Sequence, residues 1–133
     1  MAAAAWEAIL AHADTAWPDE CCGLLLGQGR MVDEVRPARN IARDPGRRFL
    51  IDPADHFAAL REARVRGRTV LGAYHSHPHG EPSPSETDIA EAVEDGQFIH
   101  VIASPPREGR PAALAAYCMT PRNFVPLRLV RMA

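Results

Sequence analysis

The 133-residue sequence lacks the features that mark membrane-spanning and nucleic-acid-binding proteins. No apolar stretch approaches the ~20 residues that a spanning helix requires, so we expect no membrane partner. Fifteen basic and 17 acidic residues give a formal charge of −2, and no basic run stands out. This balance disfavours a nucleic-acid partner held by phosphate contacts.

Cysteine is also scarce. The chain has three cysteines, and the adjacent pair Cys21 and Cys22 would point to opposite faces of a strand, so they do not form a disulfide framework. Buried small hydrophobic side chains explain the pair better than soft metal ligands do. A reducing compartment fits this usage, and we expect the cytoplasm.

Two common zinc-enzyme signatures are absent. A zinc nucleobase deaminase requires His-x-Glu followed by Pro-Cys-x-x-Cys, and the sequence has neither. It also lacks the His-Glu-x-x-His helix of the common zincin proteases. Both enzyme classes are therefore excluded.

The composition suits one domain with a hydrophobic core. Hydrophobic residues make up 47% of the chain, and 133 residues are too few for two domains, so a single domain spanning residues 1–133 is predicted. The apolar pattern predicts helices over about residues 6–17, Asp52–Arg66 and Ser85–Asp95, the second with Phe57 and Leu60 on its apolar side. Strands are predicted at Cys21–Leu26, Met31–Val35, Phe49–Ile51, Thr69–His75, Phe98–Ala103, Ala112–Met119 and Val125–Val130. This mixture favours an α/β layered domain around a mostly antiparallel sheet.

The strand at Thr69–His75 ends in a His-x-His pair. Side chains alternate along a strand, so His75 and His77 project to the same side. Pro78 has no N–H and ends the ladder, which places both rings at the carboxyl edge of the strand. Open α/β sheets usually hold their sites at that edge.

Asp88 supplies a carboxylate from the next element. The segment Ser83-Pro84-Ser85-Glu86 predicts a helix start with Ser83 as N-cap and Glu86 at the capping-box position. Ser85 and Asp88 then lie three residues apart on one face. Two imidazoles and one carboxylate suit tetrahedral zinc whose fourth position is left to water, which is typical of a catalytic site. Each element alone is ordinary, and the joint spacing carries the prediction.

These residues resemble the JAMM/MPN+ metalloproteases, whose pattern is Glu, a long gap, His-Ser/Thr-His-Pro, six residues, Ser, two residues and Asp. The chain is similar to the short prokaryotic branch over most of its length and departs at no motif position. The matching residues are Glu20, His75, Ser76, His77, Pro78, Ser85 and Asp88.

The resemblance implies a deaminase-like α/β/α sandwich, with the helices at Asp52–Arg66 and Ser85–Asp95 flanking the sheet. It implies one zinc ion per chain, Glu20 as general base, and Ser85 as oxyanion donor, although Ser85 could also be a mere helix cap. The zinc ligands it implies are His75, His77 and Asp88. The implied substrate is a ubiquitin-like or sulfur-carrier protein, cut after its C-terminal Gly-Gly.

Several alternatives stay open. The chain could be a non-catalytic MPN scaffold, although every metal position is filled, or a cell-wall or phage-tail peptidase, although these usually carry a further domain for which 133 residues leave no room. The leaving group could be cysteine, a lysine isopeptide or a C-terminal extension. The sequence does not decide the oligomeric state, including a homodimer, or whether His79 shapes access to the metal.

Overall fold

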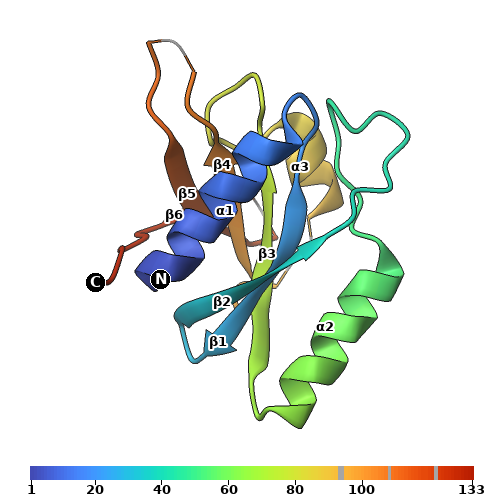
Figure 1. The fold of residues 1–133 in the computed structure, drawn as a ribbon, viewed down its shortest axis with the longest axis vertical. Helices are drawn as coiled ribbons and strands as arrows, with labels where there is room; N and C mark the ends of the chain where they lie inside the picture. Colours follow the sequence, from blue (N-terminus) through green and yellow to red (C-terminus); the bar gives the residue numbers. More distant parts are fainter. Residues whose placement is uncertain (93–94, 108, 122) are drawn as a thin grey trace.

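The computed structural model describes residues 1–92, 95–107, 109–121 and 123–133 (Figure 1). Within these residues a six-stranded sheet has the order β2-β1-β3-β4-β5-β6. Only β3 and β4 pair in parallel; the other neighbours are antiparallel. The strands are β1 (Cys22–Gln28), β2 (Met31–Ala38), β3 (Thr69–Ser76), β4 (Ile99–Ser104), β5 (Ala113–Met119) and β6 (Phe124–Leu127).

Helices cover both faces of the sheet. The helix α1 (Ala3–Ala16) packs against β2, β3, β4 and β5, and α2 (Pro53–Val65) packs against β1, β2 and β3. Alternation along β1 separates the two layers, because Leu25 belongs to the buried cluster that includes Ile9 of α1, whereas Leu24 belongs to the cluster of α2. The predicted α/β fold with a mostly antiparallel mixed sheet is thus confirmed.

One of the two helices that cover the sheet is not the helix that was predicted. The short helix α3 (Glu86–Glu91) has no buried residue, and Ile89 is 39% exposed, so α1 takes the place expected of the third helix. The helix begins one residue later than the predicted range Ser85–Asp95, and residues 93–94 of that range lie outside the described residues. Six residues make fewer than two turns, which cannot present a continuous apolar face to a sheet.

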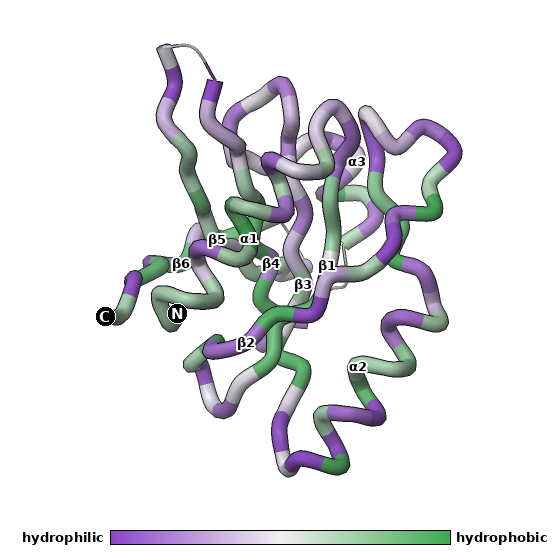
Figure 2. Tube along the Cα trace, in the orientation of Figure 1, coloured by the Kyte–Doolittle hydropathy of each residue, from purple (hydrophilic) through white to green (hydrophobic). Residues whose placement is uncertain are grey.

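The buried side of α2 was also predicted wrongly. Phe57 and Leu60 are 66% and 42% exposed, whereas Ala59 and Ala63 are buried. Small alanines allow the helix to approach the sheet closely, and Figure 2 shows hydrophilic and hydrophobic residues alternating along its length. Asp52 caps this helix as predicted, because its side chain accepts the N–H of Ala54.

Two strand predictions need correction. The segment Phe49–Ile51 forms no strand and contributes an isolated bridge between Ile51 and Asn40. The last predicted strand, Val125–Val130, starts one residue earlier and ends at Leu127. Among the described residues, no helix is long and apolar enough to cross a membrane.

Candidate metal centre

The two histidines meet at the carboxyl end of β3, as the alternation of side chains predicts. His75 lies inside the strand, and His77 follows Ser76, its last residue. Their Nε2 atoms lie 3.2 Å apart. The backbone N–H of His77 donates to the carbonyl of Ala103 in β4 at 2.8 Å, which holds this segment against the parallel neighbour.

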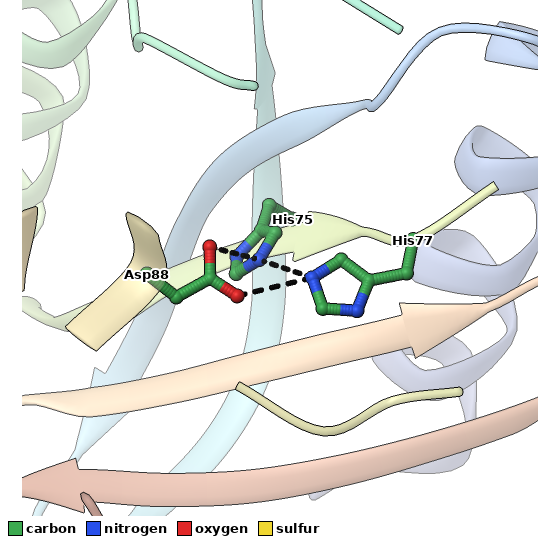
Figure 3. Close-up of side chains that lie close together, drawn as sticks. All are labelled: His75, His77 and Asp88. Carbon is green, nitrogen blue, oxygen red and sulfur yellow. Dashed lines mark hydrogen bonds and ion pairs between the residues drawn. The ribbon is translucent and has the colours of Figure 1, made fainter. Parts of the chain in front are cut away.

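Asp88 completes a group of three side chains from the first turn of α3. Its Oδ1 lies 3.2 Å from His75 Nε2, and its Oδ2 lies 3.0 Å from His77 Nε2. Figure 3 shows the three side chains pointing toward one another. The chain therefore brings together, across a gap of ten residues, the three groups that the sequence singled out.

The spacing of these atoms fits a metal ion. One ligand atom from each residue lies within 4.8 Å of the others. Tetrahedral zinc with bonds of about 2.0–2.1 Å holds its ligand atoms about 3.3 Å apart. The observed separations of 3.0 to 3.2 Å are close to this value. Two imidazole nitrogens and a carboxylate oxygen are also the donors that zinc prefers.

Neighbouring groups hold the three side chains in place. His77 Nδ1 lies 2.8 Å from the carbonyl oxygen of Glu81, and a carbonyl can only accept, so Nδ1 carries a proton and Nε2 is the nitrogen that could bind a metal ion. The N–H of Ser85 donates to Asp88 Oδ2 at 2.9 Å. Phe49 stacks on His75 with 4.2 Å between the ring centroids.

Glu20 lies beside this group. The ladder pairs Cys22 of β1 with His75 of β3, and the N–H of Ser76 donates to the carbonyl of Cys21 at 3.1 Å. Continuing this register places Glu20 opposite His77. The side chain of Glu20 is buried, with the residue only 7% exposed.

Burial sets the electrostatics of Glu20. It raises the pKa of this carboxyl to about 7, with His77 lowering the pKa and Asp88 raising it. A carboxyl group with a pKa near neutrality can both take and return a proton at physiological pH.

The pKa values of Asp88 and His77 are shifted in opposite directions, and the pKa of His75 is lowered. Burial raises the pKa of Asp88, but hydrogen bonds from His75 and His77 outweigh it and hold the pKa well below its usual range. Burial lowers the pKa of His75. Burial also acts to lower the pKa of His77, but the hydrogen bonds to Asp88 and Glu81 outweigh this effect and raise the pKa. An ionised carboxylate beside a neutral His75 matches the protonation states that metal binding requires.

Ser85, and not Ser83, is the N-cap of α3. Its hydroxyl accepts the N–H of Asp88 at 3.0 Å, and the Asp88 carboxylate accepts the N–H of Ser85 in return. Aspartate therefore fills the position where the sequence suggested Glu86, which corrects that prediction. The cap places the hydroxyl next to the three-residue group.

The remaining candidates lie outside this group. His79 is exposed and stands edge-on to Trp17, with 5.7 Å between ring centroids. Cys21 and Cys22 are buried, and burial raises the pKa values of their thiols to about 11 and about 12, so they are poor thiolate ligands.

Sequence reasoning missed Phe49 and the carbonyl of Glu81. The stacking of Phe49 depends on the path of a long loop. Backbone carbonyls leave no signature in a sequence. The spacing of ligands could not have revealed either contact.

The chain matches known proteins over most of its length. A family model of prokaryotic homologues of the JAB domain matches residues 2–116. The chain is 35% identical over 119 residues to a desampylase of Haloferax volcanii, covering 85% of this chain and 84% of that protein. It is 32% identical over 121 residues to tail tip assembly protein K of Escherichia phage N15, covering 91% of this chain but 44% of that protein.

Two further matches extend this comparison. A probable TtuB-protein conjugate cleaving protease of Thermus thermophilus is 38% identical over 86 residues, which is 65% of this chain and 57% of that protein. The solution structure of a Desulfitobacterium hafniense protein superposes with a TM-score of 0.85 at 28% identity, covering 99% of this chain and 93% of that one.

Proposed function

This chain belongs to the family of prokaryotic homologues of the JAB domain and is a peptidase of the JAMM type, and we propose that it uses one zinc ion to cut the bond after the C-terminal Gly-Gly of a ubiquitin-like or sulfur-carrier protein. The observation that carries this proposal is the meeting of His75, His77 and Asp88 within 3.2 Å of one another. A zinc ion held there would acidify a water molecule to a pKa of about 7 and polarise the scissile carbonyl.

Glu20 is the proposed general base. It is buried opposite His77, and its pKa of about 7 lets it accept a proton from the attacking water. The same carboxyl then returns the proton to the leaving amine.

Ser85 is the proposed oxyanion donor. Its hydroxyl oxygen accepts the N–H of Asp88, but a hydroxyl also carries a hydrogen that it can donate. The capping bond therefore fixes the oxygen while the hydrogen stays available for the developing negative charge on the substrate. Capping and oxyanion stabilisation are compatible roles here.

The names of two relatives support a protein conjugate as substrate. One is a desampylase and one is a probable TtuB-protein conjugate cleaving protease. An extended Gly-Gly tail can reach the metal centre where a folded segment cannot, and a strand edge can hold it by main-chain pairing. Cys21, Cys22 and Cys118 are free and buried, which suits a reducing cytoplasm.

The decisive experiment incubates zinc-loaded protein with ubiquitin-like carriers that end in Gly-Gly followed by cysteine, by a short extension, or by an isopeptide-linked lysine. Mass spectrometry then identifies the cut bond and the leaving group. Carriers whose final glycine is replaced by valine are the matched control, and we expect sharply reduced cleavage of them. Equal cleavage of the valine carriers would make this a general peptidase.

A second candidate function rests on the phage relative. The chain aligns with 44% of a tail tip assembly protein. We also consider a peptidase that acts on cell-wall peptides, which would use the same centre. Peptidoglycan stem peptides added to the same panel separate the two. Cleavage of stem peptides without cleavage of any carrier would favour this function, and no turnover with either would favour a non-catalytic scaffold.

A further inference from the structure

The loop between β3 and α3 is held by side chains more than by its own backbone. Residues 79–84 include two prolines, which have no N–H to donate. Among the described residues, the backbone of this loop makes one hydrogen bond to other backbone, from the N–H of Gly80 to the carbonyl of His77 at 3.4 Å. Yet the loop carries the Glu81 carbonyl that accepts the Nδ1 proton of His77. Other contacts must therefore fix the position of this carbonyl.

Three consecutive carbonyls of the loop accept hydrogen bonds from three different segments. The first, at Gly80, accepts the hydroxyl of Ser104 in β4 at 2.7 Å. The third, at Pro82, accepts the hydroxyl of Tyr117 in β5 at 3.0 Å. The middle one is the Glu81 carbonyl, which lies 2.8 Å from the histidine Nδ1. The acceptor of the histidine ring is thus fixed on both sides.

Both hydroxyls come from the face of the sheet to which His75 points. In the parallel register His75 pairs with Ile102, and alternation along β4 returns the same face two residues later, at Ser104. Tyr117 pairs with His100, which lies on this face by the same alternation. The two donors therefore stand on the side of the sheet that holds the candidate metal centre.

The two donors are well supported. Ser104 is fully buried. The half-buried ring of Tyr117 lies beside the ring of Phe124 in β6, with 5.9 Å between the ring centroids. Both donors belong to paired strands, which move less than the loops that connect them. The loop is consequently attached to the most rigid part of the domain.

We propose that Ser104 and Tyr117 are positioning residues of the candidate metal centre, an inference that rests on the proposed zinc peptidase function and adds two residues to it. By fixing the carbonyls on either side of Glu81, they hold the acceptor of His77 Nδ1 and keep Nε2 turned toward Asp88. Groups that orient a metal-binding histidine typically contribute about 10–100-fold to metal affinity. Both residues act through the loop and not on the substrate.

Zinc affinity separates this role from simple support of the fold. We expect Tyr117→Phe and Ser104→Ala each to bind zinc about tenfold or more weakly than wild type, in competition with a chelator. Tyr74→Phe is the matched control, because it removes a tyrosine hydroxyl that also has a partner, His12, but in the core that faces α1. It should keep the zinc affinity of wild type whatever stability it loses.

A spectroscopic measurement follows the His77 ring directly. In protein with isotopically labelled histidine, we expect the Nδ1 proton bound to Glu81 to exchange slowly with water, and His77→Ala identifies its signal. Exchange should become about tenfold faster or more in Tyr117→Phe and keep the wild-type rate in Tyr74→Phe. The measurement is made with and without zinc. Tyr117→Phe keeps the packed ring and decides the matter if Ser104→Ala does not fold.

Either of two results contradicts the proposal. One is that Tyr117→Phe leaves both zinc affinity and ring-proton exchange unchanged. The other is an equal loss of zinc affinity in Tyr74→Phe, since general destabilisation would then explain every variant. The peptidase function is judged separately, because a wild-type protein that binds no zinc would remove that function. Exchange of the ring proton in the metal-free protein would then still show whether the two hydroxyls hold His77.

Discussion

The hydroxyl of Ser76 accepts the backbone N–H of Cys21 at 2.8 Å, and the N–H of Ser76 donates to the carbonyl of Cys21 at 3.1 Å. Both residues are buried, so this pair joins the end of β3 to the start of β1 out of reach of solvent. The residue before Cys21 is Glu20, and the residue after Ser76 is His77. One pair of residues thus sets the distance between the proposed base and a proposed ligand.

Replacing Ser76 by alanine should therefore destabilise the protein and lower its activity. The buried N–H of Cys21 would lose its acceptor, which costs about 1–3 kcal/mol in the free energy of unfolding, measured in urea. Ser76→Thr keeps the hydroxyl and is the matched control, with the larger part of stability and turnover retained. Equal stability of Ser76→Ala and wild type would show that this bond is not important.

Metal content provides a direct test of the proposed ligands. We expect about one zinc per chain in wild type and strongly reduced zinc in His77→Ala and Asp88→Ala, because each removes one of three ligands. His56→Ala, on α2, is the control and should keep its zinc. Chelation should abolish activity and leave the circular dichroism spectrum unchanged, because the core does not depend on the metal. Equal zinc in all variants would disprove the ligand assignment.

The role of Glu20 is tested by Glu20→Gln. We expect zinc to be retained and turnover to fall by about 10²–10⁴, the usual contribution of a general acid–base group, because an amide cannot accept the proton. Asp19→Asn removes a neighbouring exposed carboxylate and should leave turnover near that of wild type. Full activity of the glutamine variant would exclude Glu20 from proton transfer.

Burial of Glu20 also predicts that the free energy of unfolding of the metal-free protein depends on pH. Its pKa rises from 4.5 to about 7 on folding, so the folded state holds a proton that the unfolded state has lost between these values. Stability must then fall as pH rises through this window, by at most about 3 kcal/mol. Metal-free Glu20→Gln should match wild type below pH 4.5 and exceed its stability above pH 7, in denaturant titrations at both pH values. A constant difference across this range would contradict the shift.

Ser85→Ala separates capping from oxyanion stabilisation. Loss of the cap should lower the free energy of unfolding by about 1 kcal/mol, and loss of an oxyanion donor should lower turnover by about 10²–10³. Ser83→Ala is the control, since Ser83 does not cap α3, and should change neither quantity. A stability loss in Ser85→Ala without any change in turnover would reduce Ser85 to a cap.

Long apolar strands and strong caps were predictable, and short elements were not. The runs that become β1, β3, β4 and β5 are continuous enough to bury, and Asp52-Pro53 marks the start of α2 unambiguously. In contrast, Ser83 and Ser85 both precede a proline or an acidic residue, so local sequence offered two equivalent helix starts. Tertiary contacts of Asp88 with the histidines decided between them.

The prediction of the buried side of α2 failed for a different reason. Hydrophobicity alone ranks Phe57 and Leu60 above Ala59 and Ala63, but the two alanines are the side chains of α2 that are buried against Leu24 and Leu26 of the sheet. The proximity of the candidate ligands was predictable, because strand alternation fixes the direction of His75 and His77, and their binding of a metal ion stays a prediction. The contacts of Phe49 and of the Glu81 carbonyl with the histidines depend on the paths of loops, which have no periodicity in the sequence.

Asp88 belongs at once to the capping box of α3 and to the group that faces both histidines. Fraying of the first helical turn and withdrawal of the third ligand are consequently one event. The end of an isolated helix frays readily. The first turn of α3 can fray only when the Asp88 carboxylate separates from His75 and His77. The residence time of an ion in this centre would therefore be governed by the local opening rate of a six-residue helix.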